Sequence, residues 1–342
     1  MSAPLQLFSA ALLAAFLGPC LIAQQRPFER LNSAAFGVIS PAARVRGTPG
    51  QMTVQRTGCP ALPAAETRRR IVDLAIQEWA FFGFSIVEPG GEDFEPLDSR
   101  YSLLSPEDPA RVASSIAGYW AVTPQGFEMV AGQNRVWNGP EGTGARWVTP
   151  WSAAFVSWIM CESGLSSSEK FQRAIAHHVY IDQAIRARDE GAPQAAFTAY
   201  NPGEAEIEPG DLVCSSRRPA YRNLTERRRH MGVGARTHCD VVIKVDEPEQ
   251  RIFAIGGNVR RSVVMKPLAA VREAGKHLRP LDQTVRGEMR PVFVHLKLRA
   301  KSIEANAIDN SPTIKALVCR KEFPYPAGVL ALSPAPAARR YC

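Results

Sequence analysis

The stretch RWVTPWSAAFVSWIMCESGL, from Arg146 to Leu165, constrains the fold most, because it has the pattern of a buried helix. Thr149 is a favourable N-cap, and Pro150 follows at the first helical position, where a missing N–H costs little. Apolar side chains then recur at three- and four-residue spacing: Trp151, Ala154, Phe155, Trp158 and Ile159. Gly164 ends the segment. The pattern predicts a helix whose apolar face packs firmly against a sheet.

Ser152 falls in the first turn of this predicted helix, at its third position. The unpaired N–H groups and the positive end of the helix dipole favour an oxyanion or a developing alkoxide there. Ser152 is therefore a candidate nucleophile. The alternative is a cap or a packing residue, which is the commoner role of a serine near a helix start.

The rest of the chain divides into helical patterns followed by strand patterns. Periodic apolar spacing predicts helices over residues 64–82, 109–120 and 168–190. The arginines at the start of the first, Arg68 to Arg70, are expected on a solvated face. Short alternating runs predict strands over residues 210–214, 238–245, 251–255, 262–265 and 291–298, with a hairpin turn at 247–250. This order predicts an α+β fold with an antiparallel sheet.

The two ends of the chain differ from the middle. Residues 1–23 carry no charged side chain and contain a short apolar run, which predicts a cleaved signal peptide, export to the periplasm or exterior, and no membrane-spanning segment after cleavage. Cys20 offers lipid attachment as an alternative, which Pro19 disfavours. Residues 24–62 lack a sustained period and are expected to form a linker or loosely packed arm. One α+β domain is expected over residues 63–320, and a Pro/Ala-rich tail over 321–342.

Cysteine content and charge bear on the compartment and the partners. Removal of the leader would leave Cys59, Cys161, Cys214, Cys239, Cys319 and Cys342. An oxidising compartment favours one or two structural disulfides among them, and the sequence does not choose the pairs. The net charge of +8 favours anionic partners such as cell-wall polymers. No nucleic-acid-binding motif accompanies the charge, so nucleic acid is not an expected partner.

The string PWSAAFVSW resembles the nucleophile helix of the papain-like cell-wall hydrolases of the CHAP and NlpC types, in which a cysteine stands at the position of Ser152. It is more similar still to an uncharacterised bacterial family, domain of unknown function 2272, which carries the serine; this resemblance covers residues 68–311. It implies a papain-like α+β fold, with N-terminal helices packed on an antiparallel sheet. His238, which opens the strand HCDVVIKVD, is similar to the family histidine, and Asn258 in IGGN matches the polar residue that orients it. Asp240 competes for that role, because alternation along a strand places it on the same face as His238.

The serine changes the chemistry that the resemblance implies. A cysteine forms a thiolate readily, whereas a hydroxyl must lose its proton to a base during attack. The leading hypothesis is hydrolysis of an amide bond in peptidoglycan or a related peptide by Ser152, His238 and either Asn258 or Asp240. Two alternatives remain open: an inactive wall-binding module that uses the same cleft, and a serine esterase or acyltransferase. His238 as a core histidine and Asn258 as a turn residue with positive φ are the structural alternatives.

A basic insertion, residues 216–237, separates the first two predicted strands. Arg227, Arg228 and Arg229 are expected to attract carboxylates or phosphates of a wall polymer, and the alternative is an ordinary exposed loop.

Other polar residues add less. Trp151 and His178 are further candidates for substrate binding, and the adjacent His177 and His178 point about 100° apart on a helix, so at most one would face a cleft. No cofactor and no metal are expected, since Cys214, His230, His238 and Cys239 match no common zinc spacing.

Overall fold

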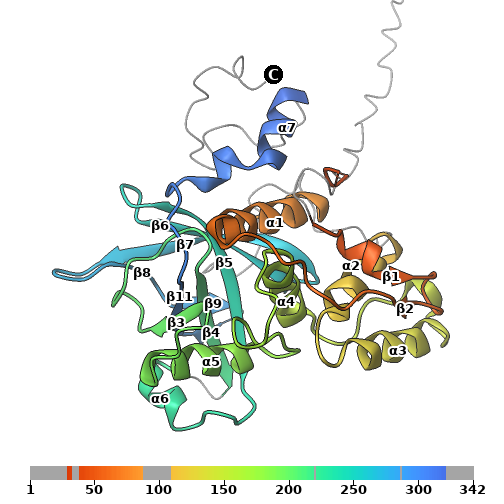
Figure 1. Ribbon diagram of the computed structural model, residues 1–342, viewed down its shortest axis with the longest axis horizontal. Coiled ribbons are helices and arrows are strands. Elements are labelled where there is room, and N and C mark those ends of the chain that lie inside the picture. Colours follow the sequence, from red (N-terminus) through yellow and green to blue (C-terminus); the bar gives the residue numbers. More distant parts are fainter. Residues whose placement is uncertain (1–28, 33–37, 88–108, 219–220, 286, 321–342) are drawn as a thin grey trace, which may run out of the picture.

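The computed structural model describes residues 29–32, 38–87, 109–218, 221–285 and 287–320, and Figure 1 shows their arrangement. The described chain is an α+β fold in which helices lie against a curled antiparallel sheet, as the sequence predicts. The predicted signal peptide and C-terminal tail lie outside the described residues. None of the described helices has both the length and the apolar character needed to cross a membrane.

The longer helices come before the main sheet in the chain, and two short ones follow later. They are α1 (Thr67–Phe81), α2 (Pro109–Ala121), α3 (Gly126–Trp137), α4 (Ser152–Glu162), α5 (His177–Asp189), α6 (Leu224–Arg228) and α7 (Pro312–Arg320), with 3-10 turns at Pro41–Arg44, Ala64–Glu66, Gly142–Gly144 and Ala307–Asn310. The predicted helix over residues 168–190 is wrong in its first part, because α5 begins only at His177. Ser157 Oγ of α4 bonds both the N–H and the carbonyl of Ala174, at 3.0 and 3.1 Å. That backbone is therefore not free to enter a helical ladder.

The strands of the main sheet follow in the second half. They are β3 (Phe197–Tyr200), β4 (Leu212–Arg218), β5 (Arg236–Asp246), β6 (Arg251–Val259), β7 (Ser262–Arg272), β8 (Leu278–Pro280) and β11 (Val292–Leu298). Their order across the sheet is β3-β11-β4-β5-β6-β7-β8, and neighbouring strands are antiparallel. Two small hairpins stand apart from it: β1 (Val45–Arg46) with β2 (Thr53–Val54), and β9 (Gln283–Val285) with β10 (Glu288–Arg290). The predicted strands are thus present, and most are longer than predicted.

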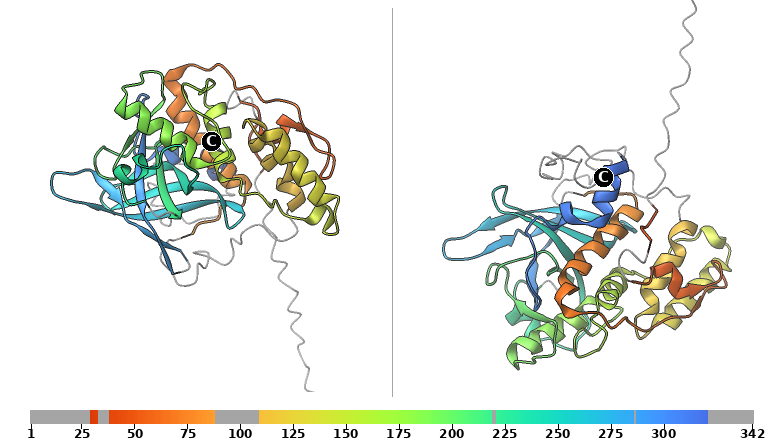
Figure 2. Two further views of the ribbon diagram at one scale, coloured as in Figure 1. Left: turned by 90° about the horizontal axis from the view of Figure 1, so that it is seen from below. Right: turned by 45° about the horizontal axis from the view of Figure 1, so that its top comes forward.

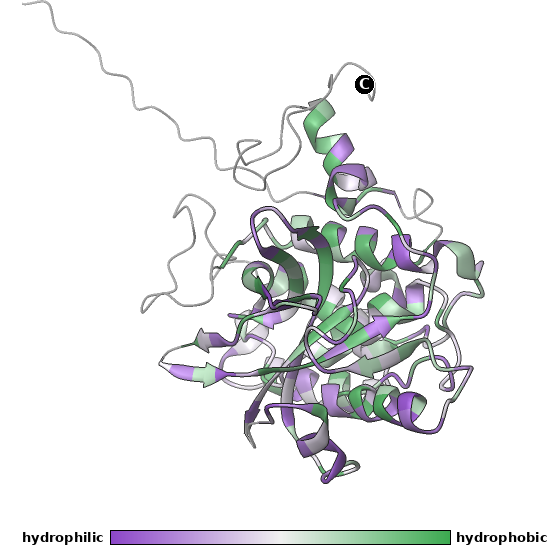
Figure 3. Cartoon of the chain, turned by 90° about the vertical axis from the view of Figure 1, so that its left-hand side faces the viewer, coloured by the Kyte–Doolittle hydropathy of each residue, from purple (hydrophilic) through white to green (hydrophobic). Residues whose placement is uncertain are grey.

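Side-chain alternation along β5 divides the core into two parts. Cys239, Val241 and Ile243 pack beneath the helices in the main hydrophobic core, whereas Val242 belongs to a second cluster formed largely by the strands. Figure 2 shows that α4 lies between the sheet and the α2–α3 pair, and in Figure 3 apolar residues gather where helices meet strands. The predicted division of β5 into two faces is confirmed, and His238 and Asp240 share the parity of Val242.

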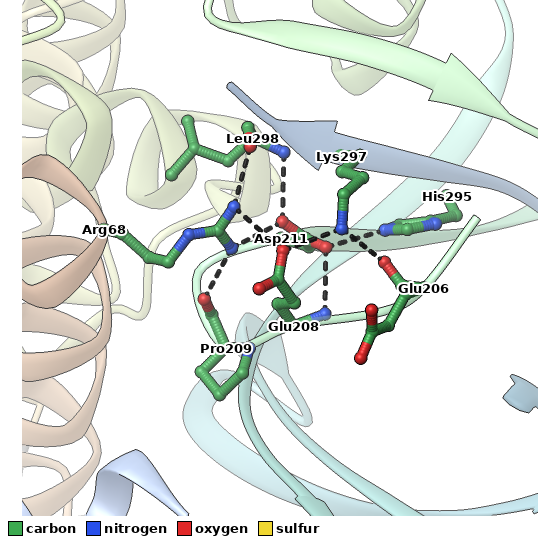
Figure 4. A network of polar contacts seen from close by, with 8 residues as sticks. All are labelled: Arg68, Glu206, Glu208, Pro209, Asp211, His295, Lys297 and Leu298. Atoms are coloured by element: carbon green, nitrogen blue, oxygen red, sulfur yellow. Dashed lines mark hydrogen bonds and ion pairs between the residues drawn. The ribbon is translucent and has the colours of Figure 1, made fainter. Parts of the chain in front are cut away.

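A buried ionic network joins α1 to the sheet, and it corrects the expectation that Arg68 faces solvent (Figure 4). Arg68 donates to Asp211 Oδ1 (2.8 Å) and to the carbonyls of Pro209 (2.8 Å) and Leu298 (2.7 Å). The other oxygen of Asp211 lies 2.8 Å from His295 Nε2. Burial alone would raise the pKa of Asp211, but His295 and Arg68 hold it below its ordinary value. The charge run at the start of α1 thus supplies a buried anchor, Arg68, followed by two partly exposed arginines.

The described part of the predicted arm, residues 24–62, packs against the helices. Arg44 is fully buried and bonds Glu162 at the end of α4, with 2.7 Å from Nε to Oε1. Arg30 bonds Glu78 of α1 at 2.5 and 2.6 Å, and Cys59 forms a disulfide with Cys161 of α4. The composition of the arm predicts loose packing, because composition does not reveal partners that lie far away in the sequence.

Asp73 of α1 provides a pH-dependent test of how α1 is buried. Burial raises the pKa of Asp73 from 3.8 to about 7, and its Oδ1 has no hydrogen-bond partner among the described residues. The folded state therefore binds more protons than the unfolded state between about pH 4 and 7, so this group's contribution to stability falls as pH rises through that window. Asp73→Asn is expected to raise the free energy of unfolding at pH 8 by up to about 4 kcal/mol and to change it little at pH 4.

Urea unfolding at the two pH values measures this difference. Glu66→Gln, at a side chain that is 64% exposed, is the control and should show little change at either pH. An equal effect of Asp73→Asn at pH 4 and pH 8 would contradict the assignment.

Candidate active site

The helix α4 begins at Ser152, so this serine is its first residue and not its third as predicted. The first helical hydrogen bond runs from the Phe155 N–H to the Trp151 carbonyl, at 3.0 Å. Trp151 thus occupies the N-cap position that Thr149 was expected to hold, and no side chain caps the helix. The side chain of Trp151 is buried against the rings of Phe82 and Tyr119. This burial corrects the expectation that Trp151 contacts a substrate.

The structure brings Ser152, His238 and Asp240 together. Ser152 Oγ lies 2.9 Å from His238 Nδ1, and His238 Nε2 lies 2.9 Å from Asp240 Oδ1. The serine comes from the start of α4, and the other two come from the start of β5, where alternation separates them by two residues. A hydroxyl, an imidazole and a carboxylate in this order form the arrangement used for nucleophilic catalysis by serine.

A second histidine, His177, completes the hydrogen bonding of the serine. His177 Nε2 lies 2.9 Å from Ser152 Oγ, while its Nδ1 accepts the Cys239 backbone N–H at 3.3 Å and contacts the Tyr180 hydroxyl. Since the backbone N–H can only donate, Nδ1 of His177 is the acceptor and Nε2–H donates to Ser152. Ser152 then donates to His238 Nδ1, and His238 Nε2–H donates to the carboxylate of Asp240. With these assignments, each hydrogen bond from His177 through Ser152 and His238 to Asp240 has one donor and one acceptor.

Lys266 of β7 fixes the carboxylate at the end of this chain. Its Nζ lies 2.5 Å from Asp240 Oδ2, so both oxygens of Asp240 are engaged. Burial alone would raise the pKa of Asp240, but the positive charge of Lys266 and the contact with His238 hold it well below its ordinary value. Asp240 is thus an anion at neutral pH.

Burial keeps both histidines neutral. It lowers the pKa of His238, which Asp240 opposes, and it lowers the pKa of His177 still further, because the neighbouring His238 adds to the effect. Burial likewise raises the pKa of Tyr180 well above its ordinary value, so its hydroxyl remains a donor. At neutral pH His238 can therefore accept a proton from Ser152.

Two glycines of β6 let the strand approach this site. A Cβ on Gly256 would lie 2.0 Å from Asp240 Oδ1 and 2.9 Å from His238 Nε2, and a Cβ on Gly257 would lie 2.6 Å from the ring of Phe155 in α4. Asn258 follows with φ +56° and lines a cavity beside His238. His238 Nε2 bonds Asp240, which is one of the two orienting residues that the sequence offers; the other is Asn258. Asn258 has the positive φ of the turn alternative.

A disulfide lies directly beneath the site. Cys214 and Cys239, which pair across β4 and β5, are bonded to each other. The disulfide therefore ties Cys239, the residue after His238, to β4. The backbone N–H of Cys239 donates to His177. The bond also removes both thiols from the zinc set considered in the sequence.

The basic insertion contains a short helix, α6, and the structure corrects the role expected of Arg227. Arg227 is fully buried and bonds both oxygens of Asp182 in α5 at 2.7 Å. Arg228 bonds Asp189 at 2.7 and 2.6 Å, and Arg229 is exposed. Among the described residues that line the cavity, none of these three is present. Arg227 thus anchors the insertion to α5 and cannot reach a substrate.

His178 was the expected substrate contact, but His177 is the histidine that faces Ser152. The ring Nδ1 of His178 accepts the backbone N–H of Ala235 at 3.4 Å, on the side of the insertion. Tyr180 and Lys266 were also missed, because a tyrosine one turn along a helix and a lysine within a strand carry no distinctive spacing. The HHVY sequence at 177–180 was the available signal, and the position of the helix start decides which histidine points inward.

A comparison with known protein families matches residues 110–298, more than half of the chain, to a family described as "Uncharacterized protein conserved in bacteria (DUF2272)". The matched region contains Ser152, His177, His238, Asp240 and Lys266. Neither a search of curated proteins nor a search of solved structures found a match. The protein is therefore a member of the domain of unknown function 2272 family, as the PWSAAFVSW string predicts.

Proposed function

We propose that the protein is an exported hydrolase with a papain-like arrangement, in which Ser152 attacks an amide bond of peptidoglycan or a related peptide. One observation carries this proposal: the directed chain of hydrogen bonds from His177 through Ser152 and His238 to Asp240. A core histidine or a packing serine would need no such order. This order leaves His238 Nδ1 able to accept the hydroxyl proton of Ser152, which supports the proposal.

The proposed reaction proceeds through an acyl-enzyme. His238 Nδ1 takes the Ser152 hydroxyl proton as Oγ bonds to the acyl carbon, and the same nitrogen then delivers that proton to the amine as the C–N bond breaks. A water molecule next loses a proton to Nδ1 and attacks the acyl carbon. The bond to Oγ breaks, and the proton returns to Ser152. Asp240 stabilises the imidazolium that forms in each half of the reaction.

The start of α4 supplies donors for the oxyanion. The N–H groups of its first residues precede the first helical hydrogen bond, which the Phe155 N–H makes, and so they lack an intrahelical partner. With the helix dipole, they stabilise negative charge that develops next to Ser152.

Three further observations support the substrate and the compartment. The chain has a net charge of +8, and arginines line the cavity beside His238, which favours an anionic wall polymer. The disulfides Cys59–Cys161 and Cys214–Cys239 fit an oxidising compartment. The resemblance of PWSAAFVSW to the nucleophile helix of the wall hydrolases supports an amide bond as the bond that is cleaved.

Labelling with a fluorophosphonate tests the nucleophile without a known substrate. Wild type should gain one covalent adduct, which peptide mass spectrometry locates on Ser152, and should release new amino and carboxyl ends from purified muropeptides. Ser152→Ala should do neither, while its unfolding curve stays close to that of wild type.

Ser152→Cys separates an enzyme from a binding module. Wild type that neither reacts with the fluorophosphonate nor cleaves muropeptides, together with an active Ser152→Cys variant, would show that the native protein is a binder. Labelling of wild type with cleavage of esters but of no muropeptide would identify an esterase instead.

A further inference from the structure

A cavity of about 1050 Å³ lies beside the candidate active site, and its lining is strongly basic. His238 and Asn258 line it, and His238 Nδ1 lies 2.9 Å from Ser152 Oγ, so the cavity lies next to the candidate nucleophile. Lys266 also lines it but pairs with Asp240. The other charged residues among the described lining are Glu141 and the arginines Arg146, Arg217, Arg260, Arg261 and Arg290. This excess of positive charge favours an anionic ligand.

Arg217 reaches this cavity from a β-bulge in β4. Ser216 pairs with Thr237 of β5 and Arg218 pairs with Arg236, so Arg217 has no partner residue on β5. A bulge of this kind re-aims a side chain, and bulges are common beside active sites. Burial and nearer charges have the larger effects on the pKa values of His177 and His238, and the guanidinium of Arg217 lowers both further. Its charge therefore acts on the candidate site.

Arg260 and Arg261 form the turn between β6 and β7, at the edge of the same cavity. Their φ angles are +50° and +67°, and the flanking residues Val259 and Ser262 pair with each other. A two-residue hairpin with positive φ at both positions favours Asn-Gly, and side chains such as arginine are strained there. Strained backbone of this kind is found where a side chain is needed for function. The backbone at Arg260 and Arg261 is thus strained, which favours a functional role for these side chains.

The remaining lining includes several apolar side chains. Trp147 and Val148 precede α4, and Val148 is 65% exposed; Val259 and Val285 also line the cavity. An apolar surface of this kind suits the carbon chain of a ligand whose charged end meets the arginines.

We infer that this cavity binds the acyl side of the substrate through an oxyanion group, a carboxylate or a phosphate, held by Arg217 and the Arg260–Arg261 turn. The forked donors of arginine match both groups, and the carbon chain lies against Trp147 and Val148. This inference rests on the proposed function, because it assigns a substrate class to the same site.

A pair of esters with one leaving group tests the inference. 4-Nitrophenyl glutarate carries a free carboxylate, and its methyl ester does not. Wild type should hydrolyse the acid with a kcat/KM at least tenfold higher than that for the methyl ester, and added salt should reduce this ratio. The double variant Arg217→Gln, Arg261→Gln should bring the ratio close to one, mainly through a higher KM for the acid. The double variant Arg46→Gln, Arg56→Gln, at two exposed arginines outside the cavity, removes the same two charges and should leave the ratio unchanged.

The outcomes separate this inference from the proposed function. A wild type that reacts with a fluorophosphonate but shows no preference for the acid overturns the inference alone. A wild type that reacts with no probe overturns the proposed function, and equilibrium dialysis of the intact acid then decides the inference: binding that the double variant loses supports it, and equal binding overturns it. Protection of Ser152 from labelling by glutarate or by inorganic phosphate distinguishes the two oxyanions.

Discussion

Replacing Asp240 with asparagine is expected to lower the rate at which Ser152 attacks an acyl or phosphonyl group by about 10⁴-fold. Lys266 Nζ lies 2.5 Å from Asp240 Oδ2, so the carbonyl oxygen of an asparagine would turn toward the lysine and its NH₂ toward His238. His238 would then accept at Nε2 and carry its proton on Nδ1. Because Ser152 Oγ faces Nδ1, the serine would meet an N–H donor on each side and no base.

The rate constant for fluorophosphonate labelling, together with kcat for a 4-nitrophenyl ester, measures this loss. The fold should be retained, because an asparagine keeps the shape and both contacts, and a thermal unfolding curve is the control. If Asn258 orients His238 instead, Asn258→Ala will cause the greater loss and Asp240→Asn will stay within tenfold of wild type.

Replacing Arg44 with methionine is expected to lower the free energy of unfolding by about 3–5 kcal/mol. Arg44 and Glu162 are both fully buried, and burial already raises the pKa of Glu162 despite the opposing charge of Arg44. Removal of the guanidinium would leave a buried carboxylate at the end of α4 with the Ile39 N–H as its remaining donor among the described residues. The carbonyls of Arg56 and Gly58 would also lose a donor.

Urea unfolding of single and double variants tests this ion pair. Arg44→Met together with Glu162→Leu should recover much of the loss, because no unpaired charge remains. Arg70→Met breaks a pair with Glu66, whose side chain is 64% exposed, and should cost only about 0.5 kcal/mol. A loss below about 1 kcal/mol for Arg44→Met would show that the arm contributes little to the stability of α4.

The sequence predicted the parts of this site that depend on local periodicity. Helical spacing located α4, and the period of two along β5 placed His238 and Asp240 on one face. The identity of the orienting residue could not be decided, because Asp240 lies near the start of β5, Asn258 lies near the end of β6, and both places adjoin His238. The bond from His238 Nε2 favours Asp240, and Lys266 of β7 holds this carboxylate through a contact that depends on the register between strands.

The sequence missed features that depend on distant partners. The bonds between Ser157 and Ala174 hold the backbone before α5 out of a helix, so α5 begins at His177. His177 then bonds Ser152. Arg227 looked like part of a solvated run, since its partner Asp182 lies in α5. A charge run reports how a segment is hydrated on average, whereas the pairing of one arginine depends on tertiary packing.

The position of α1 has a consequence for how this family is studied. The family match begins at residue 110, after α1 and after the arm that carries Arg44 and Cys59. A fragment cut at the family boundaries would lose the disulfide to Cys161, leave Glu162 buried without its cation, and uncover the sheet residues that α1 packs against. Activity measured on such a fragment would report the behaviour of a damaged core, so experiments on Ser152 require a chain that begins no later than Arg30.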